Sequence, residues 1–509
     1  MPGDERAPTA SLEAIAKKDF TGDHARHLLW RAGFGGPQRQ IDYLAGLGPA
    51  GAVDALLDFR ASAATYAAPV DDEFEKDIMA PPSEEIRRQY QQARRAQNED
   101  ELARFRRLRQ EREQEDRRQV YAMQRWWLRR MIESPRPLQE KLTLFWHGHF
   151  ATSYRTIENS YHMFVQNRLF RREAAGNFGE LLHAIIKDPA MIAYLDNNES
   201  RVGRPNENLA RELMELFSLG EGQYGEEDIK EGARALTGYT FDHNRFVFRQ
   251  EWHDKGSKSI LGRRGALKGE DFVNAILARP VCAEFVALKL YRFFVGEVPE
   301  SGAPGYRATV EVVRSLGRSL LASKYEIGPV LRRLFLSEHF YDPAVRLSRV
   351  KSPAELVVGV MRSLGTPVRD LSVLNDAMNL MGQELMFPPS VKGWDGGRSW
   401  INTSTLFVRA NITNFMLTGR MPAGMDPLAD KHPYDAASLL ADASEATGGR
   451  ERDPEALARW LIRFALGCDA PEEKAAAVVS YLRELGEVNG ETVARTLALI
   501  TAMPEYQVV

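Results

Sequence analysis

The segment Trp146-His147-Gly148-His149-Phe150 places two imidazoles two residues apart. Neutral imidazole is a common metal ligand. The two rings point the same way on extended chain but lie about 200° apart on a helix. Both histidines can bind one metal ion only if the helix ends at Gly148. The two rings could then turn toward one point in a cleft beside Trp146. The alternative interpretation is two structural histidines that form ordinary hydrogen bonds.

A second motif, Asn206-Glu207-Asn208-Leu209-Ala210-Arg211-Glu212-Leu213-Met214-Glu215-Leu216, carries three carboxylates. Pro205 and Asn206 are typical of a helix start. On that helix, polar side chains form two neighbouring rows. One row contains Glu207, Arg211 and Glu215. The other contains Asn208, Glu212 and Glu215. We expect Asn206 and Asn208 to line a cleft with them.

The leucines of this helix predict burial on more than one side, which brings Glu212 and also Glu207 close to the interior. A buried carboxylate needs an arginine, a metal or a proton held by a raised pKa. One interpretation is a salt-bridge network centred on Arg211. The other makes Glu212 a metal ligand or a general base, with Glu207 or Glu215 beside it.

Two further segments carry candidate residues on loops. His253 and Asp254, in Trp252-His253-Asp254-Lys255-Gly256-Ser257-Lys258, could ligate a metal or pair as base and orienter, and Lys258 is expected to line the same cleft. An ordinary turn is the alternative. The segment from Phe387 to Gly397 combines prolines, glycines and Trp394, which suits a rigid loop lining a cleft, or one that packs Trp394 onto the core.

Composition excludes several classes of protein. The formal net charge of −3 argues against a nucleic-acid partner. Two cysteines exclude a disulfide framework or a cysteine-rich zinc site. The sequence contains no nucleophile elbow, phosphate-binding loop or His-Glu-x-x-His motif. Neither an export signal nor an apolar run of about 18 residues is present, so we expect a cytoplasmic protein without a membrane span.

The periodicity predicts an all-α fold, a large multi-helix assembly with one short β-hairpin at 239–248. We expect N-terminal helices and a linker over 1–82, a long charged helical arm over 83–131, a helical core over 132–420 and a C-terminal helical region over 421–509. Residues 83–118 are rich in Arg, Glu and Gln and lack a coiled-coil seam. They predict a solvated arm or a surface for a protein partner.

Several segments together resemble the bacterial family catalogued as domain of unknown function 1800. These are HLLWRAGFG, LFWHGHF, NENLARELMELFSLG, ALTGYTF, HDKGSKSILG, LYRFFV, KSPAEL and MGQELMFPPSVKGW, in the family's order over roughly 24–420. The resemblance implies a helical fold with the His147/His149, Asn206–Glu215 and His253/Asp254 motifs as hallmarks. It also implies frequent export and a sulfatase-like partner family, but it implies no reaction.

Three functions are compatible with these residues. The leading hypothesis is a metal-dependent hydrolase, in which His147, His149 and Glu212 or Asp254 bind a divalent ion and Glu207 or Glu215 takes a proton from its water. The second is a metal-free enzyme acting on a glycan, with Glu212 as the acid and a second carboxylate as the base or nucleophile. Trp146 and Trp394 would then offer stacking faces for the sugar. The third is a helical scaffold or maturation partner.

Overall fold

The computed structural model describes residues 7–59, 74–420 and 434–509. In these ranges it contains 23 α-helices and two small two-stranded sheets, which confirms the predicted mainly helical fold. Residues 60–73 of the expected linker and residues 421–433 of the expected C-terminal loop lie outside the described part.

The chain begins with a short helical segment that packs on the first of two cores. Its elements are η1 (Lys17–Asp19), α1 (Gly22–Arg31) and α2 (Gln38–Leu57). Pro49 follows a break in α2 at Gly48, whose φ of 73° is accessible to glycine at little cost. Leu28 and Leu29 of α1 are fully buried, so this segment belongs to the main body.

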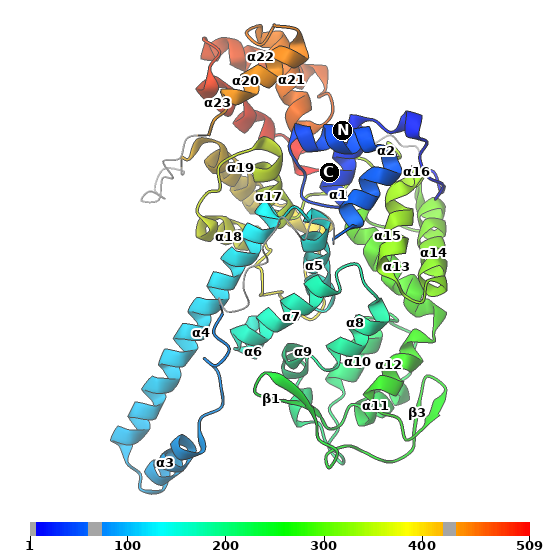
Figure 1. Ribbon diagram of the computed structural model, residues 1–509, viewed down its shortest axis with the longest axis vertical. Helices are drawn as coiled ribbons and strands as arrows, with labels where there is room; N and C mark the ends of the chain where they lie inside the picture. Colours follow the sequence, from blue (N-terminus) through cyan, green and yellow to red (C-terminus); the bar gives the residue numbers. More distant parts are fainter. Residues whose placement is uncertain (1–6, 60–73, 421–433) are drawn as a thin grey trace.

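The charged arm is a helical hairpin rather than one long helix. It consists of α3 (Glu84–Arg95) and α4 (Glu99–Glu133). Gln97 takes a positive φ of 53° and the Asn98 side chain accepts a hydrogen bond from the Glu101 N–H, so a turn and a new N-cap interrupt the predicted helix. Figure 1 shows α4 projecting from the body, with α3 at its far end.

The middle of the chain holds most of the helices and both hairpins. Its elements are α5 (Pro137–His149), α6 (Tyr154–Ile157), α7 (Ser160–Arg172), α8 (Phe178–Ile185), α9 (Pro189–Tyr194), η3 (Asn197–Glu199), α10 (Asn208–Glu215), α11 (Glu226–Ala235), β1 (Tyr239–Asp242), β2 (Arg245–Phe248), β3 (Lys258–Ile260), β4 (Arg263–Gly265), α12 (Gly269–Leu277), α13 (Pro280–Phe294), α14 (Tyr306–Ala322), α15 (Ile327–Leu336) and α16 (Glu338–Tyr341).

The β1–β2 hairpin has the predicted bounds, with Tyr239 opposite Phe248. A second hairpin, β3–β4, was not predicted. Its strands are three residues long, which is too short for an alternating pattern to be recognised.

The C-terminal part adds α17 (Pro353–Leu364), α18 (Leu371–Leu380), η4 (Gly397–Trp400), α19 (Thr403–Thr418), α20 (Ser438–Thr447), α21 (Pro454–Leu466), α22 (Glu472–Leu485), α23 (Gly490–Thr501) and η5 (Pro504–Gln507). These helices share a second core with the base of the arm, because Trp127 and Met131 of α4 belong to the same buried cluster.

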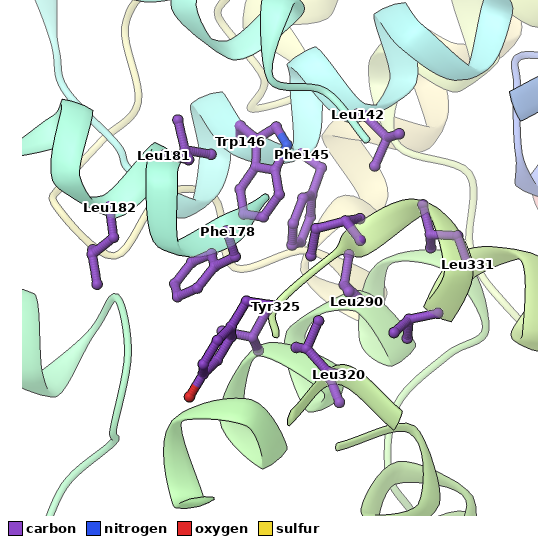
Figure 2. Close-up of a cluster of buried hydrophobic side chains, with 14 of the residues drawn as sticks. Leu142, Phe145, Trp146, Phe178, Leu181, Leu182, Leu290, Leu320, Tyr325 and Leu331 are labelled. Carbon is purple, nitrogen blue, oxygen red and sulfur yellow. The ribbon is translucent and has the colours of Figure 1, made fainter. Parts of the chain in front are cut away.

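Helix α5 lies between the two cores. Leu142 and Trp146 belong to the first core, whereas Leu144 belongs to the second. Figure 2 shows Phe145 and Trp146 of α5 facing Phe178 and the leucines of the first core. The C-terminal end of α5 is therefore fixed from two sides. Within the described ranges, none of the helices is both long and apolar enough to cross a membrane.

Candidate functional site

A cavity of about 1210 Å³ opens where α5, α10, α13 and the loop before η4 meet. Three of the four sequence motifs contribute to its wall, through His149, Glu215 and Trp394. Its volume exceeds the roughly 300–1,000 Å³ typical of small-molecule sites. The cavity is therefore large enough for an extended ligand.

The two histidines of α5 do not face one point. The helix continues to His149 instead of ending at Gly148, so the side chains remain about 200° apart around the helix axis. The His149 ring lines the cavity, and its Nε2–H donates to the Phe217 carbonyl at 3.0 Å. Burial lowers the pKa of His149 to about 3, so the ring is neutral at pH 7 and its Nδ1 carries the lone pair.

His147 points into an aromatic environment. Its ring centroid lies 5.3 Å from that of Trp127 and 5.6 Å from that of Trp394. Burial lowers the pKa of His147 to about 3, and its Nε2 has no hydrogen-bond partner in the described residues. The expectation that both imidazoles bind one ion is not met by this arrangement.

The polar residues at the start of α10 form a network on the outer surface. Arg211 contacts Glu207 at 3.4 Å and Glu226 at 3.1 Å. The Asn206 side chain accepts from the Asn208 N–H at 2.8 Å and donates to the Asp196 carbonyl. This matches the predicted Arg211-centred network, although Glu226 replaces Glu215 in it. Asn206, Glu207, Asn208 and Arg211 are not part of the cavity wall.

One turn further along α10, Glu212 and Glu215 have different surroundings. Burial raises the pKa of Glu212, and the negative charge of Glu215 raises it further. The Oε2 atom of Glu212 is buried and has no hydrogen-bond partner among the residues that the structure describes. Glu215 lines the cavity and accepts a hydrogen bond from the Tyr224 hydroxyl at 2.7 Å. Glu212 is not itself in the cavity wall, but it lies close enough to Glu215 for the charge of Glu215 to favour its protonated form.

The loop before η4 closes the cavity against the end of α5. Gly393 has a φ of 80°, and a Cβ there would lie 2.1 Å from the Gly148 carbonyl oxygen. This close approach places the Trp394 ring over Gly148 and His147. Both interpretations of the loop hold, because Trp394 packs on α5 and also lines the cavity.

The His253 motif lies outside the cavity wall and is held by hydrogen bonds. Asp254 accepts from Arg234 at 2.8 and 3.2 Å, which helps to lower the pKa of Asp254 to about 2. The Nδ1–H of His253 donates to the Thr237 carbonyl, and Lys258 Nζ donates to the Asp254 carbonyl. The turn interpretation describes this segment best.

Trp146 also differs from its predicted position. It is fully buried, and its Nε1–H donates to the Ala174 carbonyl at 2.9 Å. No face of this ring is open to a ligand, so Trp146 stabilises the core instead of lining a cleft.

Sequence reasoning missed much of the cavity wall. The missed residues that could contact a ligand include Lys289, Arg292, Glu297, Arg349, Glu355, Arg398 and Trp400. Most lie on segments without a recognisable spacing. Glu355 has a structural role that accounts for it without a ligand. Ser352 and Glu355 form the capping box at the start of α17.

The donor atoms proposed for a metal do not come together. Among the described residues, no group of three His, Cys, Asp or Glu side chains is arranged to hold a metal ion. His147, His149, Glu212, His253 and Asp254 are divided between separate environments. The residues present therefore do not fit the predicted divalent metal centre.

Comparison with known proteins supports the family but adds no activity. No curated protein and no solved structure matches the chain at a significant level. The model of one family, described as a protein of unknown function (DUF1800), matches residues 27–508, nearly the whole length. The chain belongs to this family of unknown function.

Proposed function

We propose that the protein is an enzyme that acts on a glycan-type substrate in the cavity by carboxylate acid–base chemistry. The observation that carries the proposal is the convergence of three sequence motifs on one large cavity, with Glu215 of α10 and Trp394 of the facing loop in its wall. Glu212 lies outside this wall, one helical turn before Glu215 and within reach of its charge. Because the candidate metal donors do not converge, no step is assigned to a metal ion.

Glu212 is the proposed general acid. A carboxyl group whose pKa is raised by burial and by a neighbouring negative charge retains its proton at higher pH and can deliver it to a leaving oxygen. Glu215, which accepts the Tyr224 hydrogen bond, is the proposed base or nucleophile. Side chains three residues apart on a helix have Cβ atoms about 5–6 Å apart. That spacing lets the carboxyl groups reach either separation used in glycoside hydrolysis, about 5–5.5 or 6.5–9.5 Å.

The composition of the wall favours a sugar-like ligand over an apolar one. Trp394 and Trp400 line the cavity together with both acidic and basic side chains. Aromatic faces stack on the apolar side of a sugar ring, while charged groups bind its hydroxyls. The cavity volume also suits an oligomer better than a single small molecule.

The test is the release of new reducing ends from a panel of neutral and acidic polysaccharides. The unmodified protein should cleave at least one of them, and Glu212→Gln and Glu215→Gln should each lose most of that activity. Glu207→Gln is the matched control, because Glu207 lies on the same helix segment but in the surface network. Absence of cleavage across the panel, or full activity in Glu212→Gln, would contradict the proposal.

A scaffold function is the second candidate, and the arm is the observation that favours it. The α3–α4 hairpin extends from the body and exposes Ile86, Tyr90 and Leu108. The Tyr90 ring packs edge-on against Phe105 within the hairpin, but Ile86 and Leu108 are exposed apolar side chains on a charged arm, and contiguous exposed apolar patches mark protein contacts. A stoichiometric partner that is recovered with the unmodified protein, and lost with Leu108→Asp, would support this function. Retention of the partner by that variant would exclude the exposed face of the arm around Leu108 as the contact surface.

A further inference from the structure

Five buried or nearly buried cations gather behind one end of the cavity. The fully buried ones are Arg31, Lys141 and Arg409. Lys351 is almost fully buried, and the side chain of Arg349 is 12% exposed. They come from α1, α5, the segment before α17, and α19. Segments far apart in sequence thus bring positive charge to one place.

The cluster contains too little negative charge to balance these cations. In the described part of the chain, Glu355 is the only carboxylate that forms an ion pair with any of them, and its partners are Lys141 and Arg349. Its second oxygen also accepts from the Ser352 N–H at 2.7 Å. The described residues thus provide one carboxylate for five basic side chains, and it forms ion pairs with only two of them.

The remaining cations have only neutral partners. Lys351 Nζ donates to the Tyr506 carbonyl at 2.7 Å and lies 4.1 Å from the centroid of the Trp30 ring. Arg409 donates to the Lys351 carbonyl at 2.8 Å. Burial lowers the pKa of Lys351 to about 7 and that of Arg409 to about 10. Buried charges without counter-charges are costly, and with a pKa of about 7 Lys351 is neutral in about half of the molecules at pH 7. An anion that reaches the cluster would therefore pair with the arginines and favour the protonated form of Lys351.

The cavity provides the route to this cluster. Arg349 and Glu355 lie in the cavity wall, together with Ser348 and Ser352. Both terminal nitrogens of the Arg349 guanidinium donate to the Glu355 carboxylate, whereas its buried Nε–H has no acceptor in the described residues. The guanidinium of Arg349 therefore connects the cavity to the cations behind it.

We propose that the Arg349 end of the cavity binds the anionic group of the ligand, a carboxylate, sulfate or phosphate. Arginine binds such oxyanions through fixed, charge-assisted hydrogen bonds, and the cations behind it strengthen the attraction in a low-dielectric site. The inference rests in part on the proposed function, and it specifies the substrate as an acidic glycan. The binding of an anion can nevertheless be measured without turnover.

The experiment titrates the full-length protein with sodium sulfate, sodium phosphate and sodium glucuronate by calorimetry, at constant ionic strength set with sodium chloride. We expect saturable binding of at least one anion. Tightest binding of sulfate or phosphate would indicate that the ligand carries a sulfate or phosphate group, and tightest binding of glucuronate would indicate a carboxylate. Arg349→Gln should weaken that binding at least tenfold. Arg318→Gln is the control, because Arg318 is an exposed arginine outside the cavity wall that is paired with Glu311, and it should bind as the unmodified protein does.

Lys351→Met provides a second test should Arg349→Gln fail to fold. It removes a buried cation behind the wall and should weaken anion binding several-fold. No saturable binding of any of the three anions, or unchanged affinity in folded Arg349→Gln or Lys351→Met, would overturn the inference. Glu212→Gln should still bind the anion, so loss of turnover and loss of the anion site are distinguished.

Discussion

Two of the motifs look equally suited to catalysis in sequence but differ in the structure. In the His253 motif, Asp254 is paired with Arg234, and both His253 and Lys258 donate to backbone carbonyls. At α10, the Oε2 atom of Glu212 has no hydrogen-bond partner within the described part of the chain, and Glu215 lines the cavity. The first region uses its polar atoms to hold a turn together. The second places a carboxylate, Glu215, in the cavity wall with a second carboxylate one helical turn away, and this difference separates a structural motif from a candidate active site.

The largest expected effect is on the activity of Glu212→Gln. Removing a general acid lowers kcat by about 10²–10⁴-fold. The variant should be at least as stable as the unmodified protein at pH 7, because ionising a carboxyl group with a raised pKa costs folding free energy. Rate measurements and thermal unfolding of the same preparations check both parts. A variant that is inactive because it unfolds would not support the comparison.

The loop that joins the two sides of the cavity should be sensitive to a single methyl group. Gly393→Ala combines a φ of 80° with a contact of 2.1 Å to the Gly148 carbonyl, so the loop must move. We expect a loss of about 2–3 kcal/mol in the free energy of unfolding, together with reduced activity as Trp394 shifts. Gly262→Ala, which has a positive φ but open space around it, should cost less. Equal costs would show that the close approach is unimportant.

Asp254→Ala should show the opposite pattern to Glu212→Gln. The Arg234–Asp254 pair is partly exposed, so we expect a loss of only about 1–2 kcal/mol in stability with activity per folded molecule unchanged. Urea unfolding and a rate assay measure the two quantities. A fall in kcat of tenfold or more, at equal folded fraction, would show that the His253 motif takes part in catalysis.

The same aspartate predicts a pH dependence. Its pKa is about 2 in the folded protein and about 3.9 in an unfolded chain, so the unfolded state binds more protons between these values. The stabilisation is therefore complete above about pH 4 and is lost as the pH falls toward 2. Asp254→Asn should lose less stability than the unmodified protein over this interval. Parallel losses would contradict the role of the Arg234 pair.

The smallest effect is expected for Glu207→Gln. Its contact with Arg211 is exposed and 3.4 Å long, and such pairs contribute about 0.2–1 kcal/mol. Activity should be unchanged. Thermal unfolding and the rate assay used for Glu212→Gln test this directly, and a large loss of activity would extend the site to the outer face of α10.

Sequence patterns predicted the elements better than their contacts. The alternation at 239–248 gave the β1–β2 hairpin, and helical periodicity gave α10 and α11. The break at Gln97 was missed, because strong helix formers surround a turn that one positive φ creates. At the site, Glu215 and Trp394 were predicted to line a cleft or act in it and do line the cavity, whereas Trp146 is buried. The convergence of Arg349 and Lys351 with Lys141 depends on packing between distant helices, which local spacing does not reveal.

The most direct test of the cavity as the functional site is hydrogen–deuterium exchange with and without an acidic oligosaccharide. We expect slower exchange in segments 144–149, 215–221 and 391–400, which contribute to the cavity wall, and unchanged exchange in 253–258. Protection centred on 253–258, or no protection at the cavity, would contradict this expectation.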